Sequence, residues 1–392
     1  MVGSQPLLAM NSRIRKSPYF EATLRWGCTA FTIYNHMYMP STYRGLVEDY
    51  WPLVHHASLW DVAVQRQVEI SGPDAFAFLR RLTPRNLDRF EIGQCKYLLI
   101  TDDRGVVIND PVALRLEDNH FWLSLADSDI LLWAKGLAQG WDMDVEITEP
   151  DVSPLQLQGP ASKEVIRALF GNVLDDLGYF RFRSLDLDGI PLIISRTGWS
   201  NEFGYELYLR DHRFGGDLWE RIMAAGRDHG IAPGAPSPIR RIEAGLLSQG
   251  ADMGRDENPF ELGLARQVDL EQDVDFVGRH ALEQVGATGP KRRLVGLVID
   301  GPPLASVNVD FWPVDLDEQP VGRVTSAIYS PRLQRNIALA MLATDRSEPG
   351  RALRVAVDGG HRTGSVHALP FVDPDRRLAR GLCPNTPVTQ AA

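Results

Sequence analysis

The stretch Arg196–Tyr208, with the sequence RTGWSNEFGYELY, decides the fold of this chain. It joins two short apolar runs, so it predicts a pair of strands with a polar, aromatic loop between them. Side chains alternate along a strand, which puts Glu206 and Tyr208 on the same face of the second strand. Trp199 lies in the loop, within reach of that face. The stretch therefore gathers one acid and several aromatic rings on a single surface.

This surface has two interpretations. A carboxylate flanked by aromatic rings suits a flat heteroaromatic ligand, because the ring stacks and two adjacent N–H donors pair with the carboxylate. The alternative is a hairpin with aromatic cross-strand pairs and a solvated Glu206. The pattern alone favours neither interpretation.

Two other segments carry groups with functional chemistry. In Asn109-Asp110-Pro111 the proline interrupts a strand ladder, and an acid at such an edge either points into a cleft or serves a turn. From Tyr34 to Pro40 the chain reads YNHMYMP, a set of polarisable groups that suits a cationic or sulfur-bearing ligand. For both segments the spacing alone favours the structural alternative, a turn for the first and an irregular segment docked on the core for the second.

The rest of the chain alternates short strands, turns and helices, which predicts an α+β fold. Apolar residues recur with a 3.6-residue period over Pro238–Gln249 and predict a helix there. Four runs predict a β-meander: Lys96–Thr101, Gly105–Ile108, Pro111–Leu116 and His120–Leu125. Turn residues at 286–290 mark a boundary, and the strands beyond it predict a C-terminal β-barrel domain over 286–372. The Pro- and Arg-rich residues 373–392 are expected to form a loosely ordered tail.

Composition excludes several classes of function. The 392 residues include 41 Lys and Arg against 51 Asp and Glu, a formal net charge of −10. A chain this acidic lacks the basic surface that nucleic acids and anionic membranes require, so neither is expected as a partner. No apolar run is long enough to span a membrane, and at the N-terminus the basic cluster follows the apolar piece, the reverse of a signal peptide. With three scattered cysteines and no CxxC pair, we expect a cytoplasmic protein without disulfides or structural zinc.

Common catalytic signatures are missing from the sequence. It has no phosphate-binding GxxxxGK[ST] loop, no dinucleotide-binding GxGxxG, no GxSxG elbow and no HExxH zinc motif. His55 and His56 are adjacent, and neighbours on a helix point about 100° apart, so they do not chelate one ion together. No metal is expected, and any activity must come from a site without these signatures.

Five segments in a fixed order resemble the folate-dependent aminomethyltransferase superfamily, to which the glycine-cleavage T-protein belongs. They are GVVINDPV (Gly105–Val112), RTGWSNEFGYELY (Arg196–Tyr208), RRIEAGLL (Arg240–Leu247), DVDFVGRHAL (Asp273–Leu282) and VGRVTSAIYSPRLQRNIALAML (Val321–Leu342). Within the superfamily the chain is most similar to the dimethylsulfoniopropionate demethylases, through FTIYNHMYMP, VEDYWPLVHHASLWDVAVQRQVEISGPDA, INDPVALRLEDNHFWLSLADSDILLWAKGLA and EPDVSPLQLQGP. The resemblance covers roughly residues 13–345.

The resemblance implies a fold and a reaction. The fold is a three-domain cloverleaf around a central folate channel, with 1–285 as two intertwined α+β subdomains ahead of the barrel. The reaction moves a methyl group from the sulfonium of dimethylsulfoniopropionate to N5 of tetrahydrofolate, giving methylthiopropionate and 5-methyltetrahydrofolate. Folate and a small-molecule methyl donor are the implied partners, and the oligomeric state is open, with a homodimer as one option.

The resemblance also implies roles at the folate end of the channel. Glu206 would pair with the donor edge of the pterin. Asp110 would lie near the N5 and N10 region of the folate and help the product nitrogen to lose its proton. Trp199 and Tyr208 would wall the site between folate and methyl donor. We expect Asp110, Trp199 and Tyr208 to be catalytic, and Trp199 to touch the donor as well.

At the donor end the implied residues come from the N-terminal part of the chain. Tyr34, Asn35 and His36 would approach the methyl donor. Arg13, Lys16 and His36 are candidates for holding the carboxylate of the donor. Folate and a zwitterionic donor each carry a carboxylate that the bulk charge of the protein repels slightly, so basic groups are expected to gather locally in the channel.

Two departures from these relatives leave alternatives open. T-proteins typically carry two acids where this chain has Asn109-Asp110, and the demethylases usually have Ile-Glu-Arg where this chain has Ile239-Arg240-Arg241. The alternatives are a folate-dependent demethylase of another onium or methoxy compound, an aminomethyltransferase, and a folate-binding regulator without turnover.

Overall fold

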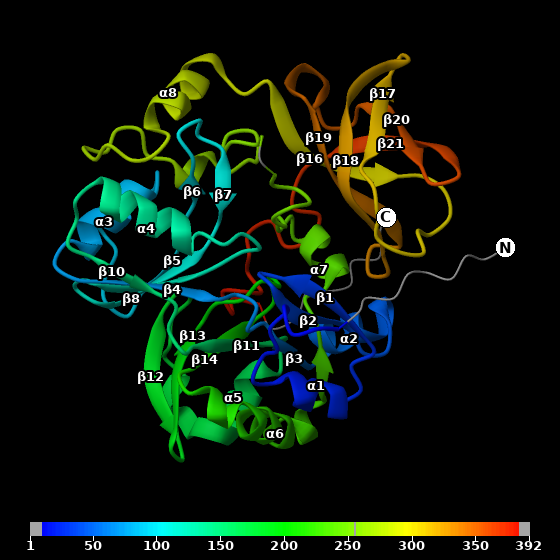
Figure 1. Ribbon diagram of the computed structural model, residues 1–392. Helices are drawn as coiled ribbons and strands as arrows, with labels where there is room; N and C mark the ends of the chain where they lie inside the picture. Colours follow the sequence, from blue (N-terminus) through cyan, green and yellow to red (C-terminus); the bar gives the residue numbers. More distant parts are fainter. Residues whose placement is uncertain (1–9, 255, 384–392) are drawn as a thin grey trace.

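The computed structural model describes residues 10–254 and 256–383. Three lobes surround a common centre, and each lobe is built on its own β-sheet (Figure 1). This is the predicted α+β cloverleaf, with a closed barrel as its C-terminal lobe. Among the helices in the two described ranges, none is long and apolar enough to cross a membrane.

The first lobe is built on a six-stranded sheet in the order β12-β13-β14-β11-β3-β15. Its strands are β3 (Ala57–Asp61), β11 (Ser153–Gln158), β12 (Phe182–Leu187), β13 (Ile190–Ser195), β14 (Gly204–Leu209) and β15 (Ile231–Gly234). The lobe also holds α1 (Phe20–Arg25), α2 (Leu46–His55), α5 (Ser162–Phe170), α6 (Gly215–Ala225) and a hairpin of β1 (Ala30–Tyr34) and β2 (Met37–Thr42). Helices α5 and α6 cover one face of the sheet, where Leu157, Leu207 and Trp219 are fully buried. All sheet neighbours are antiparallel except β15, which runs parallel to β3.

The second lobe is inserted into the first, between β3 and β11. It is a five-stranded antiparallel sheet in the order β10-β4-β9-β8-β5, so β5 is an edge strand. Its strands are β4 (Gln67–Ser71), β5 (Cys95–Tyr97), β8 (Val112–Glu117), β9 (His120–Ser124) and β10 (Glu146–Thr148). Helices α3 (Ala75–Leu82) and α4 (Leu131–Gly140) share its hydrophobic core. A separate small hairpin, β6 (Ile100–Thr101) and β7 (Val107–Asn109), extends from this lobe towards α8 (Arg279–Thr288) (Figure 1).

The third lobe is a barrel closed in the order β16-β19-β18-β17-β20-β21. Its strands are β16 (Arg292–Ile299), β17 (Trp312–Leu316), β18 (Gln319–Ser330), β19 (Arg335–Ala343), β20 (Ala352–Val357) and β21 (Gly360–His367). Helices α7 (Pro238–Glu243) and α8 lie in the connection that leads from the first lobe to the barrel. Short 3-10 helices complete the described chain: Gly171–Leu174, His212–Phe214, Arg227–His229, Ala265–Gln267 and Thr344–Arg346.

Buried ion pairs on α7 tie the lobes together. The Nε of Arg240, a fully buried residue, donates a hydrogen bond of 2.7 Å to Glu202, in the loop ahead of β14. Its Nη1 lies 3.6 Å from the carboxylate of Glu243. Glu243 in turn accepts hydrogen bonds from the Tyr50 hydroxyl on α2 (2.9 Å) and from the Ser330 hydroxyl on β18 (2.6 Å). One polar network therefore connects α7 to the first lobe, through α2 and the loop ahead of β14, and to the barrel, through β18.

Two sequence predictions of elements are wrong in detail. The helix expected over Pro238–Gln249 ends at Glu243, because the chain turns at Gly245 with φ +62°, a conformation that stops a helix. The expected meander divides into two sheets: β5, β8 and β9 belong to the five-stranded sheet, whereas β6 and β7 pair only with each other. Pro111 separates the two ladders, since it has no N–H with which to continue either one.

The C-terminal segment, defined here as residues 373–383, differs from the expected loose tail. Leu378 and Ala379 are buried, and the Arg196 guanidinium donates a 2.9 Å hydrogen bond to the Ala379 carbonyl. The Asp373 carboxylate accepts hydrogen bonds from the backbone N–H groups of Arg377 (2.8 Å) and Leu378 (2.9 Å), and so fixes a turn. The segment runs back to the centre of the molecule. The remainder of the predicted tail, 384–392, lies outside the described residues.

Candidate active site

A cavity of about 640 Å³ lies at the centre of the cloverleaf. Its wall combines the β1–β2 hairpin, the edge strand β5, the loop between β13 and β14, the segment after α7 and the C-terminal segment. Every lobe except the barrel contributes lining side chains, together with the connection that leads to the barrel. The volume is that of a site for a small organic ligand.

Glu206 on β14 lines this cavity with a buried carboxylate. The carboxylate accepts hydrogen bonds from Gln156 (2.8 Å), from the Thr197 hydroxyl and from the Tyr208 hydroxyl (3.2 Å). All three donors are neutral, and burial raises the pKa of Glu206 above its ordinary value. The alternative of a solvated Glu206 is therefore wrong. A ligand with adjacent N–H donors would offset the desolvation of this carboxylate.

Two glutamines on β11 support Glu206 and were missed in the sequence. Gln156 links the site internally, because its Nε2 donates to Glu206 while its Oε1 accepts the backbone N–H of Trp199 (3.2 Å). Gln158 holds the same loop through Ser200 (2.6 Å) and two backbone carbonyls. Gly198 and Gly204 let the Gln158 side chain pack against the backbone of this loop, because a Cβ atom on either glycine would overlap it. The signal was present in the sequence: two glutamines with a spacing of two on a strand that is otherwise apolar.

Asp110, a second predicted site acid, also lines the cavity. One carboxylate oxygen accepts a 2.9 Å hydrogen bond from the Tyr97 hydroxyl, and the other is enclosed without a hydrogen-bond partner among the described residues. Burial raises the pKa of Asp110 to about 7. The group therefore changes between neutral and charged near neutral pH, as a proton-accepting group at an active site requires.

The neighbouring Asn109 has a structural role. Its amide donates to the carbonyls of Ala126 (3.2 Å) and Ser128 (2.7 Å), and its oxygen accepts the N–H of Ala126 (3.1 Å). Asn109 is fully buried and does not contribute to the cavity lining. The cavity thus receives one carboxyl group from this pair of residues, and Asn109 fixes the loop that carries the lining residue Asp127.

The aromatic residues of the decisive loop separate into two places. Trp199 lines the cavity, half-buried, on the loop that Gln156 holds. Tyr208, expected to wall the site, is fully buried behind Glu206 and is absent from the lining. Its ring packs against Trp122 in the apolar contact between the first and second lobes. Tyr208 shares a face with Glu206 as predicted, but that face is covered by the neighbouring lobe.

The N-terminal candidates are divided in the same way. Tyr34 lines the cavity, together with Met39 on the other strand of the hairpin. Asn35 and His36 form the turn of this hairpin, with φ +47° and +59°, and neither belongs to the lining. The Asn35 amide donates to the carbonyls of Val64 (3.0 Å) and residue 126 (2.8 Å), whereas the His36 side chain is exposed. The structure therefore places neither Asn35 nor His36 in the lining of the cavity, and their contact with a substrate stays a prediction.

Basic groups gather in the cavity, as expected, but not from the predicted positions. Arg13 and Lys16 are exposed outside the lining, and Lys16 pairs with Glu21 (3.2 Å). The cations that line the cavity are Arg85, Lys96, Arg241 and Arg376. No periodic pattern of the sequence marks these four residues, because they come from a loop, an edge strand, a helix and the C-terminal segment.

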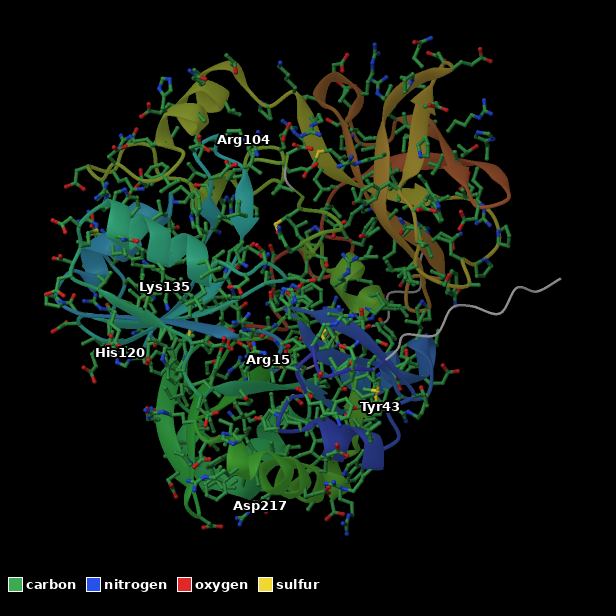
Figure 2. The ribbon with its side chains drawn as sticks, in the orientation of Figure 1. Arg15, Tyr43, Arg104, His120, Lys135 and Asp217 are labelled. Atoms are coloured by element: carbon green, nitrogen blue, oxygen red, sulfur yellow. The ribbon has the colours of Figure 1, made fainter. Side chains whose placement is uncertain are left out.

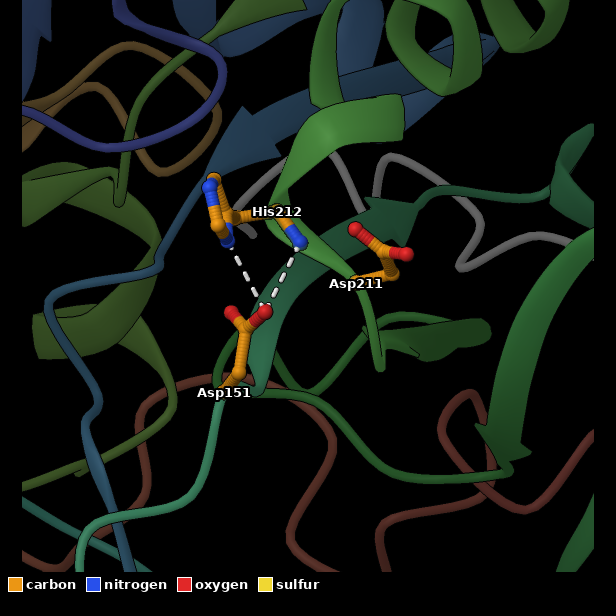
Figure 3. A group of neighbouring side chains, drawn as sticks. All are labelled: Asp151, Asp211 and His212. Carbon is orange, nitrogen blue, oxygen red and sulfur yellow. Dashed lines mark hydrogen bonds and ion pairs between the residues drawn. The ribbon is translucent and has the colours of Figure 1, made fainter.

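One group of potential metal ligands occurs among the described residues, away from the cavity. Asp151, Asp211 and His212 have ligand atoms within 4.8 Å of one another, and Figure 3 shows the three side chains together. Their atoms already have partners: Asp151 accepts from the His212 ring (2.9 Å), and Asp211 pairs with Arg213. Exposed acidic groups of this kind are common without an ion, and we assign no metal to this one.

Comparisons with known proteins match both parts of the chain. The family model of the GCVT N-terminal domain matches residues 19–272, and that of the glycine cleavage T-protein C-terminal barrel domain matches residues 292–373. A crystal structure of the glycine cleavage system aminomethyltransferase T from Bartonella henselae superposes with a TM-score of 0.82 at 24% identity, covering 92% of this chain and 98% of that one. This superposition supports the fold.

Curated relatives are similar along almost the whole chain. The dimethylsulfoniopropionate demethylase DmdA of Ruegeria pomeroyi is 39% identical over 356 residues, which cover 90% of this chain and 96% of that protein. An aminomethyltransferase of Desulfitobacterium hafniense is 31% identical over 355 residues, covering 89% of this chain and 95% of that one. The chain therefore belongs to the aminomethyltransferase family of the glycine cleavage T-protein, which includes a demethylase among its members.

Proposed function

We propose that this protein is a tetrahydrofolate-dependent demethylase that moves a methyl group from dimethylsulfoniopropionate to N5 of tetrahydrofolate. The products would be methylthiopropionate and 5-methyltetrahydrofolate. As a member of its family the protein is an enzyme that transfers one-carbon units, with tetrahydrofolate as their carrier. The identity with a relative named for this demethylation, 39% over most of both chains, supports the choice of donor.

The cavity residues fit a reduced folate. The buried carboxylate of Glu206 has only neutral partners, so it suits the adjacent N–H donors along the edge of a pterin. Trp199 offers a ring on the same wall, and the enclosed oxygen of Asp110 lacks a partner. Cations for the anionic end of the molecule line the same cavity. Each part of the ligand therefore has a complementary group in the protein.

The observation that carries the proposal is the environment of Asp110. A sulfonium methyl group leaves behind a neutral thioether, so no acid is needed to activate it. A carboxylate against the sulfonium would stabilise the ground state more than the transition state, so we place Asp110 against the acceptor nitrogen, where positive charge develops during the transfer, and not against the sulfur. Because burial raises the pKa of Asp110 to about 7, a large fraction of this group is neutral at pH 7. The groups that would contact the cationic donor are then Tyr34, Met39 and Trp199, whose aromatic rings and sulfur atom attract a cation without a full negative charge.

The remaining work of the protein is positioning. The acceptor, when bound, supplies the nucleophilic N5 atom. Methyl transfer requires this atom and the methyl carbon to lie about 3–3.5 Å apart and in line with the breaking bond. Gln156 holds both Glu206 and the backbone of the Trp199 loop, so one side chain links the group proposed for the pterin to the loop proposed to touch the donor. In its ionised form Asp110 accepts the proton that the product nitrogen must lose.

The test is incubation of the purified protein with tetrahydrofolate and a panel of donors, followed by mass spectrometry. Formation of 5-methyltetrahydrofolate from dimethylsulfoniopropionate, with release of methylthiopropionate, is the expected result. Product from another onium or methoxy compound alone, or transfer from an aminomethyl donor alone, would contradict the proposed substrate. Folate binding without transfer from any donor would contradict an enzymatic role.

A further inference from the structure

We propose that Arg85 and Lys96 form a carboxylate-binding subsite in the wall of the cavity, separate from Glu206 and Asp110. The proposal rests on the proposed function for the identity of its ligands. Its chemistry, two cations on one wall of the cavity that take a carboxylate, rests on the lining of the cavity and on the anchoring of Arg85 beside Lys96 at the Tyr97 carbonyl.

The two cations come from neighbouring elements of the second lobe. Lys96 lies on β5, the edge strand that faces the cavity, and Arg85 lies in the loop after α3. The Arg85 guanidinium is anchored to this strand, because its Nη1 donates a hydrogen bond to the Tyr97 carbonyl. The hydroxyl of the same Tyr97 holds Asp110. The cationic pair is therefore connected through one residue to the reaction centre.

Neither cation has an acidic partner in the part of the chain that the structure describes. The carboxylates nearest in sequence are already paired, Asp88 with Arg80 (3.1 Å) and Glu91 with Arg181 (2.5 Å). The Lys96 ammonium lies over the Phe90 ring, 5.5 Å from its centroid. An unpaired cation on a partly buried wall pays a desolvation cost that an anionic ligand removes.

Arg241, another cation of the cavity, differs in this respect. Arg241 is neutralised by Asp252, with Nη1 and Oδ2 2.7 Å apart, and Arg376 interacts with the Tyr179 hydroxyl. Lys96 instead faces a like charge: burial and the neighbouring Arg85 lower the pKa of its ammonium to about 8. Two like charges held side by side are unfavourable without a counter-ion. A bound carboxylate would relieve both the repulsion and the desolvation.

Two ligands of the proposed reaction carry carboxylates. One is the glutamyl end of the folate, which can be extended by further γ-linked glutamates. The other is the carboxylate of the methyl donor. Both would pair with Arg85 and Lys96 through the same charge-assisted hydrogen bonds. Binding measurements on ligands with and without each carboxylate distinguish the two sources.

The experiment compares Lys96→Met, which keeps the length of the side chain, with Lys96→Arg, which keeps the charge. Lys135→Met is the matched control, since Lys135 is exposed on α4 at the outside of the second lobe (Figure 2). Calorimetry measures the affinity for tetrahydrofolate, for its triglutamyl form and for tetrahydropteroate, which has no glutamate. Steady-state kinetics measure KM for dimethylsulfoniopropionate and for trimethylsulfonium, which has no carboxylate.

If the folate end occupies the subsite, Lys96→Met weakens the glutamyl forms about tenfold and leaves tetrahydropteroate unchanged. If the donor occupies it, KM rises for dimethylsulfoniopropionate and not for trimethylsulfonium. In either case Lys96→Arg and Lys135→Met behave as the wild type. The proposal is overturned if Lys96→Met changes no ligand, or weakens the carboxylate-free ligands equally. Because the folate arm needs no turnover, a protein that binds folate but transfers no methyl group would sink the proposed function and leave this result interpretable.

Discussion

Glu206 is a buried carboxylate held by three neutral donors. Its replacement by an amide therefore tests whether its charge binds the pterin. Glu206→Gln keeps the shape of the side chain and removes the charge that would pair with the pterin edge. We expect folate affinity to fall about 10- to 100-fold, measured by equilibrium titration. Glu283→Gln, in an exposed pair with Arg279 on α8, is the control and should change nothing. An affinity within twofold of the wild type would show that Glu206 does not bind the pterin.

Asp110 gives a prediction for the pH dependence of the reaction. Burial raises its pKa to about 7, and the proton-accepting form is the carboxylate. We therefore expect kcat/KM to rise with pH through about 7 and then to level off. Asp110→Asn should remove this rise and, for a sulfonium donor, cost less than about 100-fold in rate. An O- or N-methyl donor needs acid assistance, so near-complete loss of rate would point to that class.

The same shift predicts the effect of Asp110 on stability. Between pH 4 and 7 the folded protein holds a proton on Asp110 that the unfolded chain has released. The free energy of unfolding therefore falls as pH rises through this window and stays lower above it. Asp110→Asn does not titrate, so at pH 8 it should be more stable than the wild type by about 1–3 kcal/mol, with little difference at pH 4. Thermal unfolding at the two pH values measures this, and a variant less stable at pH 8 would refute it.

Sequence reasoning found some site residues and missed others for identifiable reasons. The alternation of side chains along a strand located Glu206 correctly, because a strand of known phase assigns each residue to a face. It failed for Tyr208, since the phase does not say which lobe covers that face. Lys96 and Arg85 gave no signal, because two cations become a pair only when an edge strand and a distant loop meet.

The hairpin β1–β2 is the element that carries Tyr34 into the cavity. The Asn35 amide docks it through two carbonyls, and the Asn35 N–H donates to the Asp127 carboxylate (2.7 Å). Asn35→Gly introduces a residue that also tolerates the positive φ, and it removes the hydrogen bonds of the Asn35 side-chain amide. We expect KM for the methyl donor to rise several-fold while folate affinity stays within about twofold.

His36 provides the matched control for the hairpin, because it occupies the same turn with an exposed side chain. His36→Gly should leave both constants unchanged within about twofold. A larger loss for His36→Gly than for Asn35→Gly would restore His36 as a substrate contact and would contradict the docking role of Asn35.

At the scale of elements the sequence was most informative where the pattern was local. The strands either side of the decisive loop and the barrel follow from apolar runs and turn residues. The helix from Pro238 was overextended, because Leu246 and Leu247 continue its apolar period beyond the turn at Gly245. The C-terminal segment was underestimated for the opposite reason. Its composition is typical of a tail, but Leu378 and Ala379 are buried against residues that are distant in sequence, such as Arg196.

The whole molecule depends on the buried charges of α7. Arg240→Met fills similar space but removes the cation that Glu202 and Glu243 share, and it leaves the buried Glu202 with Arg332 alone, at 3.5 Å. We expect a loss of about 3–5 kcal/mol in the free energy of unfolding, measured by denaturant titration. Arg221→Met breaks surface pairs with Asp188 and Asp217 instead and should leave the free energy of unfolding unchanged within the error of the titration. Equal effects of the two variants would mean that the network contributes nothing specific.

The insertion of the second lobe between β3 and β11 also sets the order in which a new chain can assemble on the ribosome. The five-stranded sheet is contiguous in sequence and can fold as soon as it emerges. Strand β3, with five consecutive buried residues, must wait for β11 and β15 to be made after that whole sheet. Arg376 is among the last lining residues to be synthesised. A prematurely terminated chain therefore lacks a complete site, so ligand binding would stabilise finished molecules selectively and leave unfinished ones to chaperones and proteases.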